Sequence, residues 1–209
     1  MGRNQAADPS AKMALQTATE TELSVYERFG PKTEVHSLMP LGGTPNVFFR
    51  TLYRPWITVF ALVPGPNNEQ YVLVTAEWKQ GNRQVTLVPI SGCAGKAEAE
   101  LPPHEAMRAT GKRVFLEEAG MEIRGIELLG SPDGYYDQTR AAELRFFPAL
   151  GTIQSTERVR AKLDTSEFVA PIFMELREWV SLIESQTTEI GFGFESCAIT
   201  TTYLALRKL

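Results

Sequence analysis

The sequence has few of the residues that build disulfide frameworks or zinc sites. Its only cysteines are Cys93 and Cys197, and its only histidines are His36 and His104. Two cysteines cannot form a disulfide framework, and these four side chains do not have the spacing of a zinc site. This composition is typical of a reducing compartment, so we expect a cytoplasmic protein.

Long apolar runs and an excess of positive charge are also absent. No stretch approaches 18 uninterrupted apolar residues, and the first twenty residues have no apolar core of the kind that signal sequences carry. The net charge of −4 gives no general attraction to nucleic acid or to an anionic membrane. We therefore expect neither as a partner, and a phosphate-bearing ligand would have to be held locally or through a metal ion.

The chain is long enough for one substantial core and a small appendage. Residues 1–22 are polar and indicate a flexible tail or a short helix, whereas residues 23–55 contain β-rich runs such as "LSVYERFG", "TEVHSLMPLGG" and "NVFFRTLYR". Residues 56–209 are expected to form the main domain. The three predicted regions are thus a tail, an N-terminal β region and one folded domain.

Within the main domain the pattern alternates between strand and helix. Strands are expected over 55–63, 70–79 and 83–91, and more strand within 123–137 and 141–150, with "SPDG" at 131–134 as a loop. A helix is expected over 103–119 that ends in a left-handed cap at Gly120. Two more helices are expected over 170–186 and 195–209. The first of these has an apolar stripe formed by Phe173, Leu176, Trp179, Val180 and Ile183. This order predicts an α/β protein with a mixed sheet between helices.

The helix at 103–119 carries the most specific chemical signal, in the stretch "PPHEAMRATGKRVFLEEAGM". Adjacent carboxylates such as Glu117 and Glu118 can bind a hard divalent cation when a third carboxylate stands one turn earlier on the same face. That earlier position holds Val114. The stretch resembles the Nudix box, G-x5-E-x7-R-E-U-x-E-E-x-G-U with U aliphatic, in which the matching residues are Glu105, Arg113, Phe115, Glu117, Glu118, Gly120 and Met121.

The start of the box departs from the template. Ala99 stands where the first glycine is required, while "PISG" ends the preceding strand earlier, so residues 93–104 are interpreted as an insertion beside the site. The insertion carries Glu98, Glu100 and His104. In the family, the box arginine commonly ties the earlier glutamate to the helix, so the resemblance implies that Glu105 and Arg113 form a structural pair.

The resemblance extends over about 180 residues, and these residues are similar to the ADP-ribose and nucleoside-diphosphate-sugar pyrophosphatase branch. Segments that carry it include "WITVFALV", "YVLVTAEWKQ" and "LLGSPDGYYDQTRAAELRFFPAL". It implies a Nudix fold, an α/β/α sandwich with an N-terminal β extension, and a homodimer formed through residues 23–55. It also implies Mg²⁺ or Mn²⁺ held by Glu117, Glu118 and a backbone carbonyl at Ser91.

Further site residues follow from the same resemblance. The "EWK" at 77–79 takes the place of a Gln-Tyr-Arg signature, so Trp78 and Lys79 are expected to bind substrate. The loop "LDTSE" corresponds to one that often contributes a catalytic glutamate. Glu167 or Asp164, or an acid of the insertion, is therefore the expected base, with Glu117 and Glu118 as the other catalytic residues.

Three functions remain open from the sequence. The first is a Mg²⁺-dependent hydrolase of a nucleoside diphosphate linked to another moiety, such as ADP-ribose or a nucleotide sugar, with slow turnover. The second is a catalytically impaired Nudix-fold protein that binds a nucleotide or a protein partner, and the third is a dimeric scaffold. Val114 is either an inert replacement facing the site, where Val114→Glu would rebuild the ligand set, or a core residue, where a new charge would be costly.

Overall fold

A computed structural model of the chain describes residues 14–17, 32–39, 46–52, 54–65, 67, 69–79, 84–137, 142–153, 169–185 and 193–209. Its internal contacts divide the chain into two compact units. The first comprises Met1–Tyr53 and Asp137–Leu144, and the second comprises Arg54–Tyr136 and Arg145–Leu209.

The first unit contains three antiparallel strands. Strand β2 (Lys32–Met39) pairs with β1 (Ala14–Thr17) on one side and β3 (Asn46–Leu52) on the other, and β3 also pairs in parallel with the start of β9 (Ala142–Ile153). The segment predicted as a tail or short helix contains strand β1. It is a strand because its backbone pairs with β2. The expected strand "LSVYERFG" lies outside the described residues.

A mixed sheet forms the centre of the second unit. Strands β4 (Trp56–Pro64), β5 (Gln70–Lys79) and β6 (Gln84–Cys93) pair antiparallel, while β9 runs parallel to β4. Strand β7 (Ile123–Leu128) pairs antiparallel with β9, which also pairs with β8 (Tyr135–Asp137). Strand β10 (Val169–Glu175) pairs antiparallel with β5, and β11 (Gly193–Phe194) pairs in parallel with β6.

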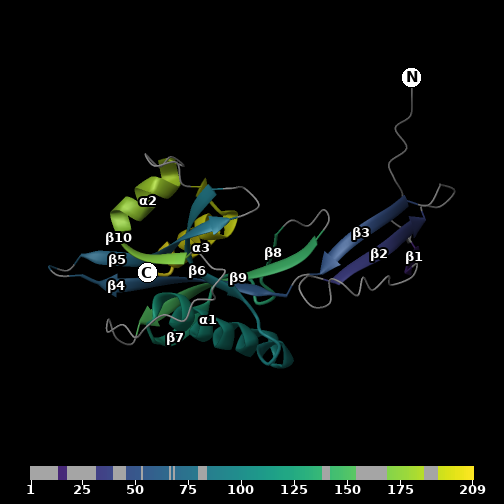
Figure 1. The fold of residues 1–209 in the computed structure, drawn as a ribbon, viewed down its shortest axis with the longest axis horizontal. Helices are drawn as coiled ribbons and strands as arrows, with labels where there is room; N and C mark the ends of the chain where they lie inside the picture. Colours follow the sequence, from purple (N-terminus) through teal and green to yellow (C-terminus); the bar gives the residue numbers. More distant parts are fainter. Residues whose placement is uncertain are drawn as a thin grey trace, which may run out of the picture. The chain divides into compact units, whose positions relative to one another are not determined.

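Helices cover both faces of this sheet. Helix α1 (Pro103–Ala119) lies on one face, and α2 (Leu176–Ser185) and α3 (Ser196–Leu206) lie on the other (Figure 1). Side chains of β4 alternate between the two layers, since Ile57 and Val59 join the cluster that contains α1, while Phe60 joins the cluster that contains Trp179 of α2. The predicted α/β/α sandwich is therefore confirmed.

Helix α1 has the bounds that the sequence predicts. Pro103 occupies its first turn, and Gly120 ends it in the left-handed conformation (φ 64°, ψ 30°), with its N–H donating to Leu116 O at 3.0 Å. Gly111 lets the helix approach the sheet closely, because a Cβ atom there would lie 2.5 Å from Cδ1 of Ile126. This close packing fixes the face that α1 turns toward the core.

The prediction of one continuous helix over 170–186 is wrong for its first half. Residues Val169–Glu175 form strand β10, which is in register with β5 along its whole length, and helix α2 begins only at Leu176. Ladder hydrogen bonds and Pro171, which disfavours helix at the preceding residue, override the helical spacing. Phe173 is consequently a half-exposed strand residue, whereas Trp179 is fully buried as predicted.

The last helix is confirmed at Ser196–Leu206, despite the β-branched "ITTT" within it. In the part of the chain that the structure describes, no helix has the length and apolar character needed to cross a membrane.

Candidate active site

Helix α1 brings Arg113 and Glu117 together on one face, one turn apart. Arg113 Nη1 donates to Glu117 Oε2 at 2.7 Å, and both side chains are more than a third exposed. The contact is an i,i+4 ion pair of the kind that helical spacing favours. Glu117 is therefore held in place before any ligand arrives.

The other side of the Arg113 guanidinium binds Glu98, which belongs to the short 3-10 turn η2 (Glu98–Glu100). Arg113 Nε donates to Glu98 Oε1 at 2.7 Å, and Nη2 donates to Glu98 Oε2 at 3.1 Å and to Cys93 O at 2.7 Å. The backbone N–H of Gly95 also donates to Glu98. The hydrogen bond from Arg113 holds the pKa of Glu98 below its usual range, and the same bond raises the pKa of Arg113.

The expected pairing of Glu105 with Arg113 is therefore wrong. Both residues lie on α1, and eight residues of helix separate them by about 12 Å along the axis. Glu105 is exposed in the first turn, while Arg113 binds Glu98 instead. Because α1 already begins at Pro103, Glu105 lies on the same helix as Arg113 and more than two turns before it, so the two side chains do not meet.

This contact also corrects the register of the first half of the box. Gly92 and Glu98 are separated by five residues, which is the G-x5-E spacing of the template. On this register the additional residues lie between Glu98 and Arg113 and include the first turns of α1, so they share only residues 99–104 with the insertion expected at 93–104. The sequence contained this signal, but the spacing from Glu105 to Arg113 concealed it.

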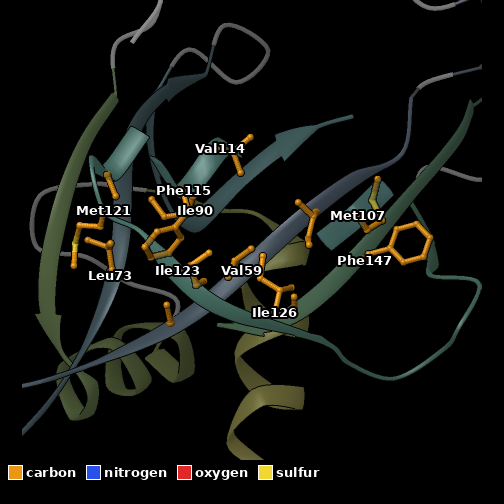
Figure 2. Close-up of a cluster of buried hydrophobic side chains, with 14 of the residues drawn as sticks. Val59, Leu73, Ile90, Met107, Val114, Phe115, Met121, Ile123, Ile126 and Phe147 are labelled. Carbon is orange, nitrogen blue, oxygen red and sulfur yellow. The ribbon is translucent and has the colours of Figure 1, made fainter. Parts of the chain in front are cut away.

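Val114 is a core residue and does not face the site. Its side chain is 4% exposed and lies in the cluster with Phe115 and Ile90 (Figure 2). A Cβ atom at Gly92 would collide with Cγ1 of Val114, so the valine methyl groups pack directly on the backbone of β6. Of the two interpretations open from the sequence, the buried one holds.

The remaining expected ligands are Glu118 and Ser91. Glu118 is half-buried at the end of α1, next to Glu117. Ser91 precedes Gly92 on β6 and pairs with Thr58 of β4. Since successive strand residues point to opposite faces and Gly92 faces α1, only the backbone of Ser91 is available on the α1 side.

Among the described residues, no three His, Cys, Asp or Glu side chains gather closely enough to hold a metal ion. The box therefore supplies two adjacent carboxylates, with a backbone oxygen of Ser91 as a possible third donor. Glu167 and Asp164 lie outside the described residues. Their expected role as base stays a prediction.

Trp78 and Lys79 lie at the end of β5 and differ in how far they are exposed to solvent. Trp78 is 46% exposed, whereas the Lys79 ammonium contacts Glu77 Oε2 at 2.7 Å and Glu195 Oε1 at 3.5 Å. Burial lowers the pKa of Lys79, but the bonds to the two glutamates outweigh it and raise the pKa overall. Glu195, just before α3, was not predicted, because only the fold brings it to β5.

His104 and Cys93 lie in the same region, and neither is a candidate for chemistry. His104 Nε2 donates to Pro132 O, which ties the start of α1 to the loop before β8. Burial raises the pKa of the Cys93 thiol, so this cysteine has no activated thiolate.

No family model matches the sequence, and no curated protein sequence matches it either. The crystal structure of an ADP compounds hydrolase, however, is similar to the chain with a TM-score of 0.64, over 94% of this chain and 91% of that one. The fold is Nudix-like. The sequence identity to that hydrolase is 15%, so the likeness concerns the fold alone, and the activity of the chain has to be argued from its own residues.

Proposed function

We propose that the protein is a slow hydrolase of nucleoside diphosphates linked to another moiety, such as ADP-ribose or a nucleotide sugar. The observation that carries the proposal is the pair Glu117 and Glu118 at the end of α1, within a Nudix-like fold and beside the strand that carries Ser91. Water would add across the diphosphate bond to give a nucleoside monophosphate and the phosphate of the second moiety.

The donor set is compatible with a divalent ion that the substrate also holds. Mg²⁺ commonly keeps several waters and is bound through one or two carboxylates together with substrate phosphates. Glu117, Glu118 and the backbone carbonyl of Ser91 would hold Mg²⁺ or Mn²⁺ in this way. When bound, the ion would neutralise phosphate charge and lower the pKa of a bound water.

The chain's own residues have distinct roles in this proposal. Arg113 positions Glu117 through their 2.7 Å contact, and Glu98 in turn fixes Arg113. Glu167 or Asp164, or an acid near η2 such as Glu100, would accept the proton of the attacking water. Turnover should be slow, because the third carboxylate is missing. Each missing charge at a transition state of this kind costs roughly a factor of 10² to 10³ in rate.

Substrate binding would fall to Trp78 and Lys79. The exposed face of Trp78 is suited to stacking on a base or a sugar. Lys79 would have to exchange part of its contact with Glu77 or Glu195 for a phosphate oxygen. Its contribution to affinity should therefore be smaller than that of a lysine without carboxylate partners.

A second candidate is a Nudix-fold protein that binds a nucleotide or a protein partner without hydrolysis. The burial of Val114 favours it, because the position that should supply a third carboxylate faces the core. The two candidates differ in product formation and not in ligand binding.

The deciding experiment measures product release from a panel of nucleoside diphosphate derivatives with Mg²⁺ and with Mn²⁺. The first candidate predicts release by the wild-type protein and loss of release in a Glu117→Gln, Glu118→Gln double variant. Glu105→Gln serves as the matched control, since Glu105 is exposed on the same helix and contacts neither Arg113 nor the box carboxylates in the part that the structure describes. Ligand binding by calorimetry without any release would favour the second candidate.

We also propose that the protein is a cytoplasmic homodimer that pairs through residues 23–55. Among the described residues, β3 pairs with β9 only through Thr51 and Leu52, so a second chain could pair with the rest of that edge of β3. Light scattering at micromolar concentration should give twice the mass of one chain. A monomeric mass would contradict the proposal.

A further inference from the structure

Lys79 has two carboxylate partners, which come from different parts of the chain. Glu77 lies two residues earlier on the same face of β5, and its Oε2 is 2.7 Å from the Lys79 ammonium. Glu195 lies just before α3, and its Oε1 is 3.5 Å from the same nitrogen. One positive charge is thus set against two negative charges, so the cluster is negative when its three groups are ionised. The longer contact, to Glu195, is the weaker of the two.

The fold around Glu195 holds its side chain in this position. Strand β11 pairs with β6 through Gly193 and Phe194 and brings the next residue close to β5. Although Glu195 is the residue that precedes α3, its side chain makes no capping hydrogen bond to the helix. Its Oε2 instead accepts a 3.5 Å hydrogen bond from the buried Cys197 thiol. Burial raises the pKa of Cys197, so the thiol keeps the proton that it donates.

Lys79 also lies within electrostatic reach of the candidate site. Burial raises the pKa of the Cys93 thiol, and Arg54, Lys79 and Arg113 each oppose this shift through their positive charge. Arg113 donates to the carbonyl oxygen of the same cysteine. An anionic ligand near the end of β6 would therefore meet a lysine whose charge its two glutamates already balance.

We propose that Glu195 is a specificity-determining residue that selects the charge of the ligand at Lys79, favouring a diphosphate esterified at both ends over one that ends in a free phosphate. The proposal rests on the proposed function, since a diphosphate has to reach Lys79. A phosphate oxygen must displace Glu195 from the ammonium or bind beside it, and its repulsion by the two carboxylates grows with its negative charge. A terminal phosphate carries up to about one more negative charge than a diester phosphate at neutral pH, so it meets the larger repulsion.

The test uses the full chain and calorimetry with two ligands that cannot be hydrolysed at the bridge, methylene-bridged ADP-ribose and methylene-bridged ADP. Both are measured with Mg²⁺ at about pH 8, above the second pKa of a terminal phosphate, which is about 6. In Glu195→Gln the affinity for the ADP analogue should rise at least about threefold more than the affinity for the ADP-ribose analogue, because a nearby negative charge is gone. Glu195→Asp keeps the charge and should keep the wild-type ratio of affinities. High salt should reduce the difference between Glu195→Gln and wild type, which a purely structural role of Glu195 would not do.

Glu127→Gln is the matched control, because Glu127 also contacts a lysine, Lys208 just after α3, at 2.9 Å. This variant should leave the ratio of the two affinities unchanged. The same ratio in wild type and in Glu195→Gln would overturn the proposal, and so would a wild-type protein that binds neither analogue. Hydrolysis is read separately, from product release on ADP-ribose. A ratio that shifts in Glu195→Gln without any product release would retain the role of Glu195 and lose the hydrolase assignment.

Discussion

Replacing Val114 with glutamate puts a carboxyl group into the cluster that α1 shares with the sheet. If this position faced the site, the substitution would rebuild a three-carboxylate ligand set and strengthen metal binding. Val114 is only 4% exposed and packs on Gly92, so the structure predicts a loss of stability instead.

The magnitude follows from burial and from size. Buried glutamates reach pKa values of about 8, roughly 4 units above the unfolded value, and each unit corresponds to about 1.4 kcal/mol. The ionisation penalty at pH 8 is therefore about 4–5 kcal/mol, and forcing a larger side chain against Gly92 adds about 1–3 kcal/mol. A loss of this size is comparable to the whole stability of many domains.

The sign of the pH dependence distinguishes charge from size. The introduced carboxyl has a folded pKa raised above its unfolded value, so the variant is least affected below about pH 4.5 and loses stability as the pH rises toward about 8. Val114→Gln is the matched control, because it has nearly the same size but does not titrate. Urea denaturation should show a larger loss of unfolding free energy relative to wild type at pH 8 than at pH 5 for Val114→Glu. For Val114→Gln the loss should be the same at both pH values. A Val114→Glu protein as stable as wild type at pH 8, with tighter Mn²⁺ binding, would refute the argument.

Two other predictions concern contacts around the same helix. Glu98→Gln should lower the free energy of unfolding by about 1–2 kcal/mol, discounted for the partial exposure of Arg113, whereas Glu105→Gln should change it by less than about 0.5 kcal/mol in urea denaturation. Arg113 depresses the pKa of Glu98 below 4.5, so the stability difference between wild type and Glu98→Gln should be fully present above pH 4.5 and should shrink as the pH falls through the folded pKa. A stability difference that grows in acid would contradict the assignment. Gly92→Ala should cost about 1–3 kcal/mol in the wild type and clearly less in a Val114→Ala background, and a double-mutant cycle with no coupling would mean that the two residues do not touch.

The elements that the sequence predicts best are those whose local signals agree with one another. Helix α1 has proline at its start, a left-handed glycine at its end and an apolar face, and its observed bounds are those predicted. Strand β10 was missed because its spacing mimics a helical stripe, and only pairing with β5 decides between the two. Tertiary contacts thus overrode a local pattern.

The candidate site was predictable in part for a similar reason. The position of Arg113 on the helix face follows from helical spacing, and its contact with Glu117 is a local i,i+4 pair. Its second partner, Glu98, lies 15 residues away along the chain, and two glutamates, Glu98 and Glu105, each satisfied part of the box spacing. The burial of Val114 depends on how α1 sits on β6, which spacing alone does not determine.

The hydrolase proposal depends on whether Glu117 and Glu118 support cleavage of a diphosphate bond. The most direct measurement is the rate of nucleoside monophosphate release from ADP-ribose and nucleotide sugars with Mg²⁺, for wild type and for the Glu117→Gln, Glu118→Gln double variant. We predict slow but measurable release by the wild type and a fall of about a hundredfold or more in the variant, since each lost charge at the reacting phosphate is costly. Release at the same rate in both proteins, or no release from any compound by the wild type, would contradict the account.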